Sequence, residues 1–258
     1  MGTVTMGTHI KSFLNLLLGV ALLTMLAACS SAPNDLSAIS DDPYETTNRR
    51  LFAFNSGLDS YLVEPAANIY RNAIPAGGQR AVRNHVEWMS MPSTAVNSTL
   101  QGKWENAGLA ILNFAFNGLT LGLVDIMDED DKPQREDFGQ TLAHNNVAPG
   151  SYVVLPVFGG TTMRGAAGTV VDFVLNPLSA IDAGTTGDTV KDATLPVDAV
   201  SFRADNFETI NQLKYESADP YARARAVYIQ QRSALLEDRM VEDGQSAVAD
   251  DNFDSFFE

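Results

Sequence analysis

The sequence predicts a mainly α-helical protein. Apolar residues recur at three- and four-residue intervals along one face of a first helix: Leu51, Phe54, Leu58 and Tyr61. An uncharged run spans residues 107–124, and Asp219-Pro220 begins a last long helical pattern. The pieces between them are rich in glycine and proline, which predicts loops with at most one short hairpin.

The first 28 residues predict a lipoprotein signal peptide. A weakly cationic start precedes a short apolar stretch at residues 13–25, which is too short for a membrane span. It ends in Leu-Ala-Ala followed by Cys29, the only cysteine of the chain, and this resembles the bacterial lipobox. Such a motif makes Cys29 the acylated first residue of the mature protein. The alternative is a soluble exported protein with a chance cysteine at the cleavage site.

The remaining chain divides into three parts. Residues 29–41 are small and polar without an apolar period, which predicts a flexible tether. Residues 42–240 contain the helical patterns and form one predicted domain. Residues 241–258 are acidic, carry three phenylalanines and are predicted to be disordered.

The charge of the chain excludes one class of partner and constrains another. The formal net charge is −15, and removal of Lys11 with the signal peptide makes it one unit more negative. Phosphate backbones repel such a protein, so nucleic-acid binding is excluded. A basic patch for anionic lipid is not expected either, so attachment must rest on acyl chains and apolar surface. Ser30, not Asp, follows Cys29 and favours the outer membrane.

The run at residues 107–124 has one narrow polar line. Its members are spaced by four and three residues: Asn113, Asn117 and Thr120. As one helix the run would measure about 27 Å. Gly118 and Gly122 would let another helix approach closely. Three interpretations are open: a buried core helix, a helix with lipid outside and a polar passage inside, or a membrane span.

The segments around this run are predicted from local signals. Gly77-Gly78 predicts a turn, and residues 81–91 predict a helix that ends before Pro92. Residues 176–196 predict a loop. Trp88 and Trp104 are interpreted as core or interfacial anchors.

Catalysis has little support in the sequence. No spacing of histidine, cysteine and carboxylate suits a metal site, and no Gly-x-Ser-x-Gly motif is present. The acidic stretch at residues 125–131 is interpreted as a solvated loop, with a divalent cation as the alternative. His85 and His144 are interpreted as structural. We therefore expect no cofactor, no metal and no enzyme, although carboxylate pairs leave a hydrolase open.

Ordered segments of the chain together resemble the VacJ/MlaA family of outer-membrane lipoproteins. These segments lie at residues 42–55, 92–102, 114–125, 137–142, 149–156, 163–172 and 219–223. The resemblance covers residues 42–232 and follows a lipobox.

The resemblance implies a ring of amphipathic helices in one leaflet of the outer membrane, on the periplasmic side, around an amphipathic channel. It also implies association with a trimeric porin and transfer of stray phospholipids to a soluble periplasmic carrier, which preserves lipid asymmetry. The family segment matching Ala53, Phe54 and Asn55 helps to set the state of the channel, and Ala53 stands where relatives often carry a polar residue. Candidate lipid-path residues are therefore Phe54, Asn55, Asn113, Asn117, Gly118, Thr120 and Gly122. A non-catalytic lipoprotein that tethers an envelope complex is the main alternative.

Overall fold

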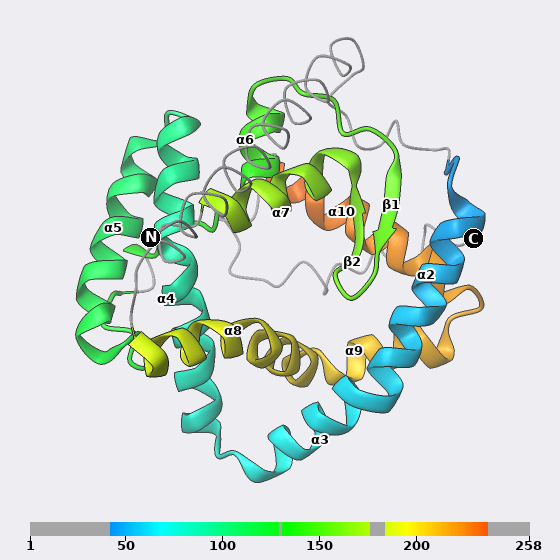
Figure 1. The fold of residues 1–258 in the computed structure, drawn as a ribbon, viewed down its shortest axis with the longest axis horizontal. Helices are drawn as coiled ribbons and strands as arrows, with labels where there is room; N and C mark the ends of the chain where they lie inside the picture. Colours follow the sequence, from blue (N-terminus) through cyan, green and yellow to red (C-terminus); the bar gives the residue numbers. More distant parts are fainter. Residues whose placement is uncertain (1–41, 129–130, 176–183, 237–258) are drawn as a thin grey trace, which may run out of the picture.

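The described helices are arranged in a ring (Figure 1). The computed structural model describes residues 42–128, 131–175 and 184–236. The helices are α2 (Glu45–Leu58), α3 (Glu64–Ala73), α4 (Ala76–Leu100), α5 (Trp104–Asn117), α6 (Phe138–His144), α7 (Met163–Leu175), α8 (Gly184–Asp205), α9 (Phe207–Asn211) and α10 (Pro220–Leu236). One two-stranded sheet, β1 (Tyr152–Leu155) and β2 (Gly159–Thr162), completes it. The mainly helical prediction with one short hairpin is confirmed.

The first arc of the ring is a nearly continuous rod. A π-helix, Asp59–Val63, joins α2 to α3. Pro65 occupies the start of α3, where its missing N–H would have had no partner in an isolated helix. The helical path therefore continues through Pro65.

Three local predictions were wrong. Gly77 and Gly78 lie in the first turn of α4, and this helix continues through Pro92 to Leu100. Packing along α5 outweighs the cost of a proline inside the helix. Residues 184–196, predicted as loop, belong to α8. Helix propensity is a weak prior that such tertiary contacts override.

The apolar run after α4 forms a shorter helix than its composition suggests. Helix α5 ends at Asn117, and a 3₁₀ turn, Gly118–Thr120, follows. Leu121 and Gly122 then adopt left-handed conformations with φ of 55° and 71°. The prediction of one helix over residues 107–124 was therefore wrong in its last turns, and the chain reverses there.

A buried asparagine joins α2 to the hairpin. Asn48 donates from Nδ2 to the carbonyl of Tyr152 (3.1 Å) and accepts at Oδ1 from the amide of Val154 (2.9 Å). Tyr152, Val154 and Tyr221 form a small core beside this clamp. The strands pair antiparallel, with Tyr152 opposite Thr162.

A second polar junction connects α4, α6 and α7. The buried Asn97 donates to Oδ1 of Asp172 (2.9 Å) and accepts from the hydroxyl of Thr141 (2.8 Å). The other oxygen of Asp172 accepts from the amide of Phe138 (2.9 Å). Burial raises the pKa of Asp172, because the charged carboxylate is desolvated there.

A third junction connects the π-helix to the last helices. Arg203 of α8 and Lys214 both contact Asp59, at 3.0 and 2.7 Å. Lys214 also reaches Glu64 (3.2 Å), whose pKa is lowered, chiefly by the hydrogen bond that Tyr215 donates. Helix α3 packs beside α8 in the same region. The ring is thus closed here by partly buried charges.

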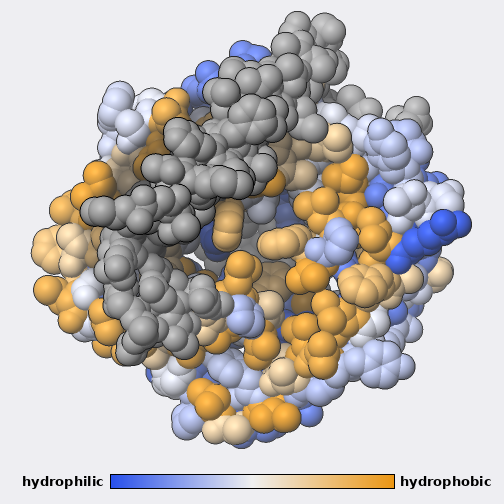
Figure 2. Space-filling view, viewed as in Figure 1, coloured by the Kyte–Doolittle hydropathy of each residue, from blue (hydrophilic) through white to orange (hydrophobic). Residues whose placement is uncertain are grey.

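Polar and apolar side chains are distributed unusually between interior and surface. The buried side chains include many amides and hydroxyls, among them Asn48, Thr94, Asn97 and Ser98. Many large apolar side chains are exposed, and Trp104 and Leu119 are 70% and 80% exposed. Figure 2 shows apolar side chains spread over one face of the ring around a central hollow.

Asn48→Ala should destabilise the fold by about 2–4 kcal/mol, because the buried carbonyl of Tyr152 and amide of Val154 would lose their partner. Chemical denaturation in detergent measures this. Thr47→Ala, at the exposed neighbouring position, should change stability by less than about 0.5 kcal/mol. Equal effects of the two substitutions would contradict the clamp.

The Arg232–Asp137 ion pair should make stability depend on acid pH. Burial favours the neutral acid, but the hydrogen bonds and charge of Arg232 outweigh it and hold the pKa of Asp137 below its usual value. The stabilisation is therefore complete above the unfolded pKa, about 3.9, and is lost as the pH falls through the lower folded pKa. Asp137→Asn keeps an N-cap for α6 and should flatten the decline in unfolding midpoint between pH 5 and pH 2. An unchanged decline would rule out this pair as its source.

Candidate functional site

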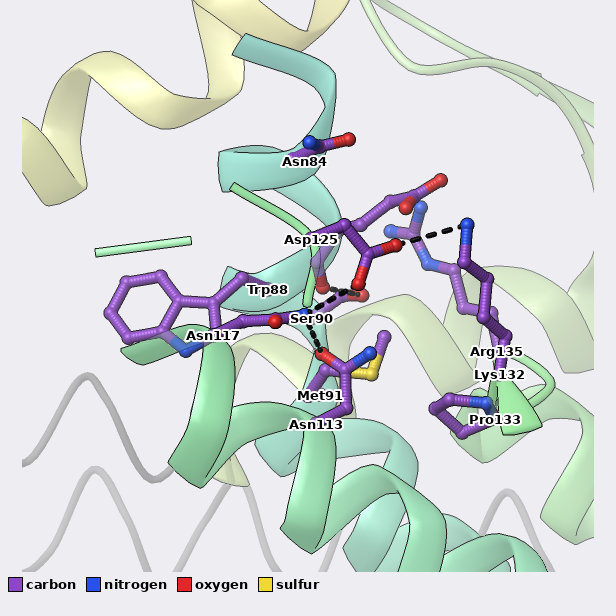
Figure 3. A pocket seen from close by; sticks show the side chains of 11 residues that line it. Asn84, Trp88, Ser90, Met91, Asn113, Asn117, Asp125, Lys132, Pro133 and Arg135 are labelled. Carbon is purple, nitrogen blue, oxygen red and sulfur yellow. Dashed lines mark hydrogen bonds and ion pairs between the residues drawn. The ribbon is translucent and has the colours of Figure 1, made fainter. Parts of the chain in front are cut away.

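The end of α5 and the loop after it form a polar anchor. Asn117 donates from Nδ2 to Oδ1 of Asn113 (3.1 Å) and to Oδ1 of Asp125 (2.9 Å). Its own Oδ1 accepts from the amide of Ile126 (2.8 Å). Both asparagines are buried. Two members of the predicted polar line therefore meet, and they hold the returning chain against the helix (Figure 3).

Thr120, the third member of that line, closes the turn. Its hydroxyl donates to the carbonyl of Asn117 (3.0 Å) and accepts from the amide of Val124 (3.1 Å). These bonds engage the hydroxyl in holding the backbone of the reversal. The line predicted on one straight helix thus becomes a folded cluster.

The two glycines allow Trp88 of α4 to pack closely. A Cβ on Gly122 would lie 2.5 Å from Cβ of Trp88, and the positive φ of Gly122 disfavours any other residue. A Cβ on Gly118 would meet the same indole at 3.5 Å. Trp88 stacks on Phe114 at 5.1 Å and donates from Nε1 to its carbonyl (2.9 Å). The close approach predicted for these glycines is made by this tryptophan.

A cleft of about 160 Å³ opens between α4 and this loop. Its polar lining combines the amides of Asn84, Asn113 and Asn117 with charged side chains from two segments: Glu87, Asp125, Lys132 and Arg135. Figure 3 shows the labelled side chains, among them Asn84, Asn117 and Arg135, converging from α4, α5 and the following loop.

Charges in the cleft are partly compensated. Lys132 contacts Asp125 at 3.0 Å. Burial opposes ionisation of Asp125, but hydrogen bonds from Lys132 and Asn117 lower its pKa overall. Water reaches Glu87 through the open mouth, yet the protein atoms around its carboxylate raise its pKa. The description of residues 125–131 as a solvated acidic loop was therefore wrong for Asp125.

Phe54 and Asn55 lie elsewhere in the ring, on α2 (Figure 1). Asn55 donates to the carbonyl of Leu155 (2.9 Å) and accepts from the amide of Val157 (2.8 Å), so it holds the turn of the hairpin. Phe54 is exposed. The structure brings five of the predicted residues together beside Trp88 and keeps these two apart from them.

Other predicted features have simpler outcomes. Cys29 lies outside the described residues. The ring of His85 lies 2.6 Å from the carbonyl of Leu121, as expected of a structural histidine. Among the residues that the structure describes, no group of three or more histidine, cysteine or carboxylate side chains could hold a metal ion. Sequence reasoning missed Glu87, Lys132 and Arg135, because no short motif links them.

Exposed apolar side chains lie at the end of α5 and in the segment that follows it. They are Phe116, Leu119, Leu121, Leu123, Val124 and Ile126. No helix within the described ranges has the length and apolar character needed to cross a membrane. The membrane-span interpretation of residues 107–124 is therefore wrong, and the apolar surface belongs to a short helix and a loop.

Comparison with known proteins places the chain. The family model described as MlaA lipoprotein matches residues 40–235. The chain belongs to the MlaA lipoprotein family. An uncharacterized protein of Rickettsia bellii is 36% identical over 204 residues, which cover 76% of this chain and 77% of the relative. The intermembrane phospholipid transport system lipoprotein MlaA of Shigella flexneri is 32% identical over 226 residues, 82% of this chain and 84% of the relative.

A solved structure agrees with the MlaA assignment. It comes from work on the structural basis for maintenance of bacterial outer membrane lipid asymmetry. The alignment has a TM-score of 0.62 at 29% identity and covers 76% of this chain and 98% of the solved chain. The ring described above is thus shared with an MlaA-like neighbour.

Asn117→Ala should loosen the loop after α5. The amide of Ile126 loses its acceptor, so its hydrogen exchange should accelerate at least tenfold, measured by exchange and mass spectrometry of peptides covering residues 121–127. Asn72→Ala is the control, because Asn72 bonds only to Asn68 within its own helix. Unchanged exchange in the loop would show that Asn117 does not hold it.

Proposed function

We propose that this MlaA-family protein is an outer-membrane lipoprotein, attached through Cys29 on the periplasmic side, that maintains lipid asymmetry. It lets phospholipids that have reached the outer leaflet pass through the ring toward a soluble periplasmic carrier. Two relatives are named intermembrane phospholipid transport system lipoprotein MlaA, and these names support a role in phospholipid transport. The trimeric porin and the carrier enter the proposal through the family resemblance.

The proposal rests mainly on one observation: the interior contains many polar side chains, and the surface contains many large apolar ones. Buried positions hold amides and hydroxyls, while large apolar side chains are exposed. Exposed apolar surface of this extent is characteristic of contact with lipid or another protein. In a bilayer the exposed apolar side chains would contact acyl chains, and the buried polar side chains would be shielded from the acyl chains.

Helix α5 is too short to span the bilayer. Its 14 residues give about 21 Å, shorter than the hydrocarbon core of about 30 Å. The helix presents Ile111, Leu112 and Phe116 to its surroundings and keeps Asn113 and Asn117 buried. A helix of this kind can lie within one leaflet while its polar side faces the protein.

The mechanism requires no covalent step. A charged headgroup in hydrocarbon costs several kcal/mol, and polar groups along a protected path lower that cost. Neutral amides and hydroxyls contribute to such a path, because they form hydrogen bonds with a headgroup. Asn117 also anchors the loop, so its replacement would test the loop and the path together.

Deletion of the gene should increase phospholipid exposure on the outer leaflet, measured by an outer-leaflet acylation or labelling assay on intact cells. Wild type should reverse the increase. Cys29→Ala should not, because the single signal for acylation is lost. Unchanged exposure on deletion would contradict the proposal and leave an anchored scaffold that tethers an envelope complex.

A further inference from the structure

Two charged side chains in the cleft beside Trp88 have no protein partner. Neither the carboxylate of Glu87 nor the guanidinium of Arg135 forms a hydrogen bond or an ion pair with a described residue. They do not pair with each other either, although both line the same cleft. Both residues are exposed in the cleft, so a ligand that carries both signs can reach them.

The cleft is lined by side chains of both signs: Glu87 and Asp125 are acidic, and Lys132 and Arg135 are basic. Lys132 and Arg135 lie close enough to favour ionisation of Glu87, but burial outweighs them and raises its pKa. An ammonium group beside Glu87 would offset that desolvation by its opposite charge. An anionic oxygen beside Arg135 would receive planar, charge-assisted hydrogen bonds.

The surroundings favour a lipid over a soluble molecule. The chain between Asn117 and Asp125, both of which line the cleft, exposes Leu119, Leu121 and Leu123. A headgroup in the cleft would thus place its acyl chains along an aliphatic rim. The cleft itself is too small for acyl chains, because about 160 Å³ holds only a small polar group.

The net charge of the protein and the packing around Trp88 restrict which class of lipid headgroup suits the cleft. A chain with a formal net charge of −15 repels anionic lipid, so a zwitterion is favoured. A quaternary ammonium would need open aromatic faces. Trp88 is covered by Phe114 on one side, and His85 and Gly122 also pack against it. A primary ammonium, which donates hydrogen bonds to a carboxylate, fits better.

We propose that this cleft is a headgroup site for a zwitterionic phospholipid with a primary amine. Glu87 contacts the ammonium group, and Arg135 contacts the phosphate. The inference rests on the proposed lipid transport and adds a headgroup preference to it. It also assigns a role to α4, which the family resemblance did not supply.

The test uses the full-length protein in detergent, with Trp104→Phe so that Trp88 alone reports binding. Dihexanoyl phosphatidylethanolamine should bind at least fivefold more tightly than dihexanoyl phosphatidylcholine. Glu87→Gln should weaken the ethanolamine lipid at least tenfold and leave the choline lipid within twofold. Arg135→Gln should weaken both. Arg50→Gln and Glu105→Gln, at exposed positions outside the cleft, should change neither.

Three results would overturn the site. Equal binding of the two lipids by the unsubstituted cleft would exclude the amine contact, and this measurement does not depend on whether a variant folds. An unchanged affinity in Glu87→Gln would exclude that residue. Free phosphoethanolamine binding as tightly as the lipid would indicate a soluble ligand.

Complementation of the deletion strain distinguishes the headgroup site from the transport proposal. If wild type fails to restore asymmetry in the deletion strain, transport itself is wrong. If wild type restores it and Glu87→Gln restores it equally while ethanolamine lipid is the exposed species, transport stands and the headgroup site falls. Slower restoration by Glu87→Gln supports both.

Discussion

Buried polar side chains hold this ring closed, and each depends on hydrogen bonds that water cannot replace. Asp172 joins three helices by accepting from Asn97 and from the amide of Phe138. Asn48 joins α2 to the hairpin in the same way. Such groups are costly to bury without partners, so they define which helices meet and at what register.

This dependence follows from where the apolar side chains lie. Many of them are exposed, so they add little to contacts between helices. In lipid, apolar surface gives no hydrophobic drive for helices to associate, and polar contacts and close packing remain. Trp88 against Gly118 and Gly122 is a packing contact of this kind.

Local patterns correctly predicted the elements whose structure follows from the spacing of apolar residues and turn residues in the sequence. The first helix, the short hairpin and the helix after Asp219-Pro220 agree with the structure. Predictions from glycine, proline and composition failed where distant contacts decide. Gly77-Gly78 begins a helix instead of a turn, and Pro92 stays inside α4 beside α5. The helix formed by the uncharged run ends at Asn117, where the Asn117 side chain accepts a hydrogen bond from the returning backbone at Ile126.

The sequence by itself determined the helical class, the lipobox cysteine and the polar residues of the α5 region, because periodicity and motifs are properties of neighbouring positions. Only the tertiary structure decided that Asn113 and Asn117 anchor a loop, that Asn55 holds the hairpin on another part of the ring, and that Glu87 and Arg135 share a cleft. Glu87 and Arg135 are 48 residues apart in the sequence. No local pattern encodes which distant side chains a closed ring brings together.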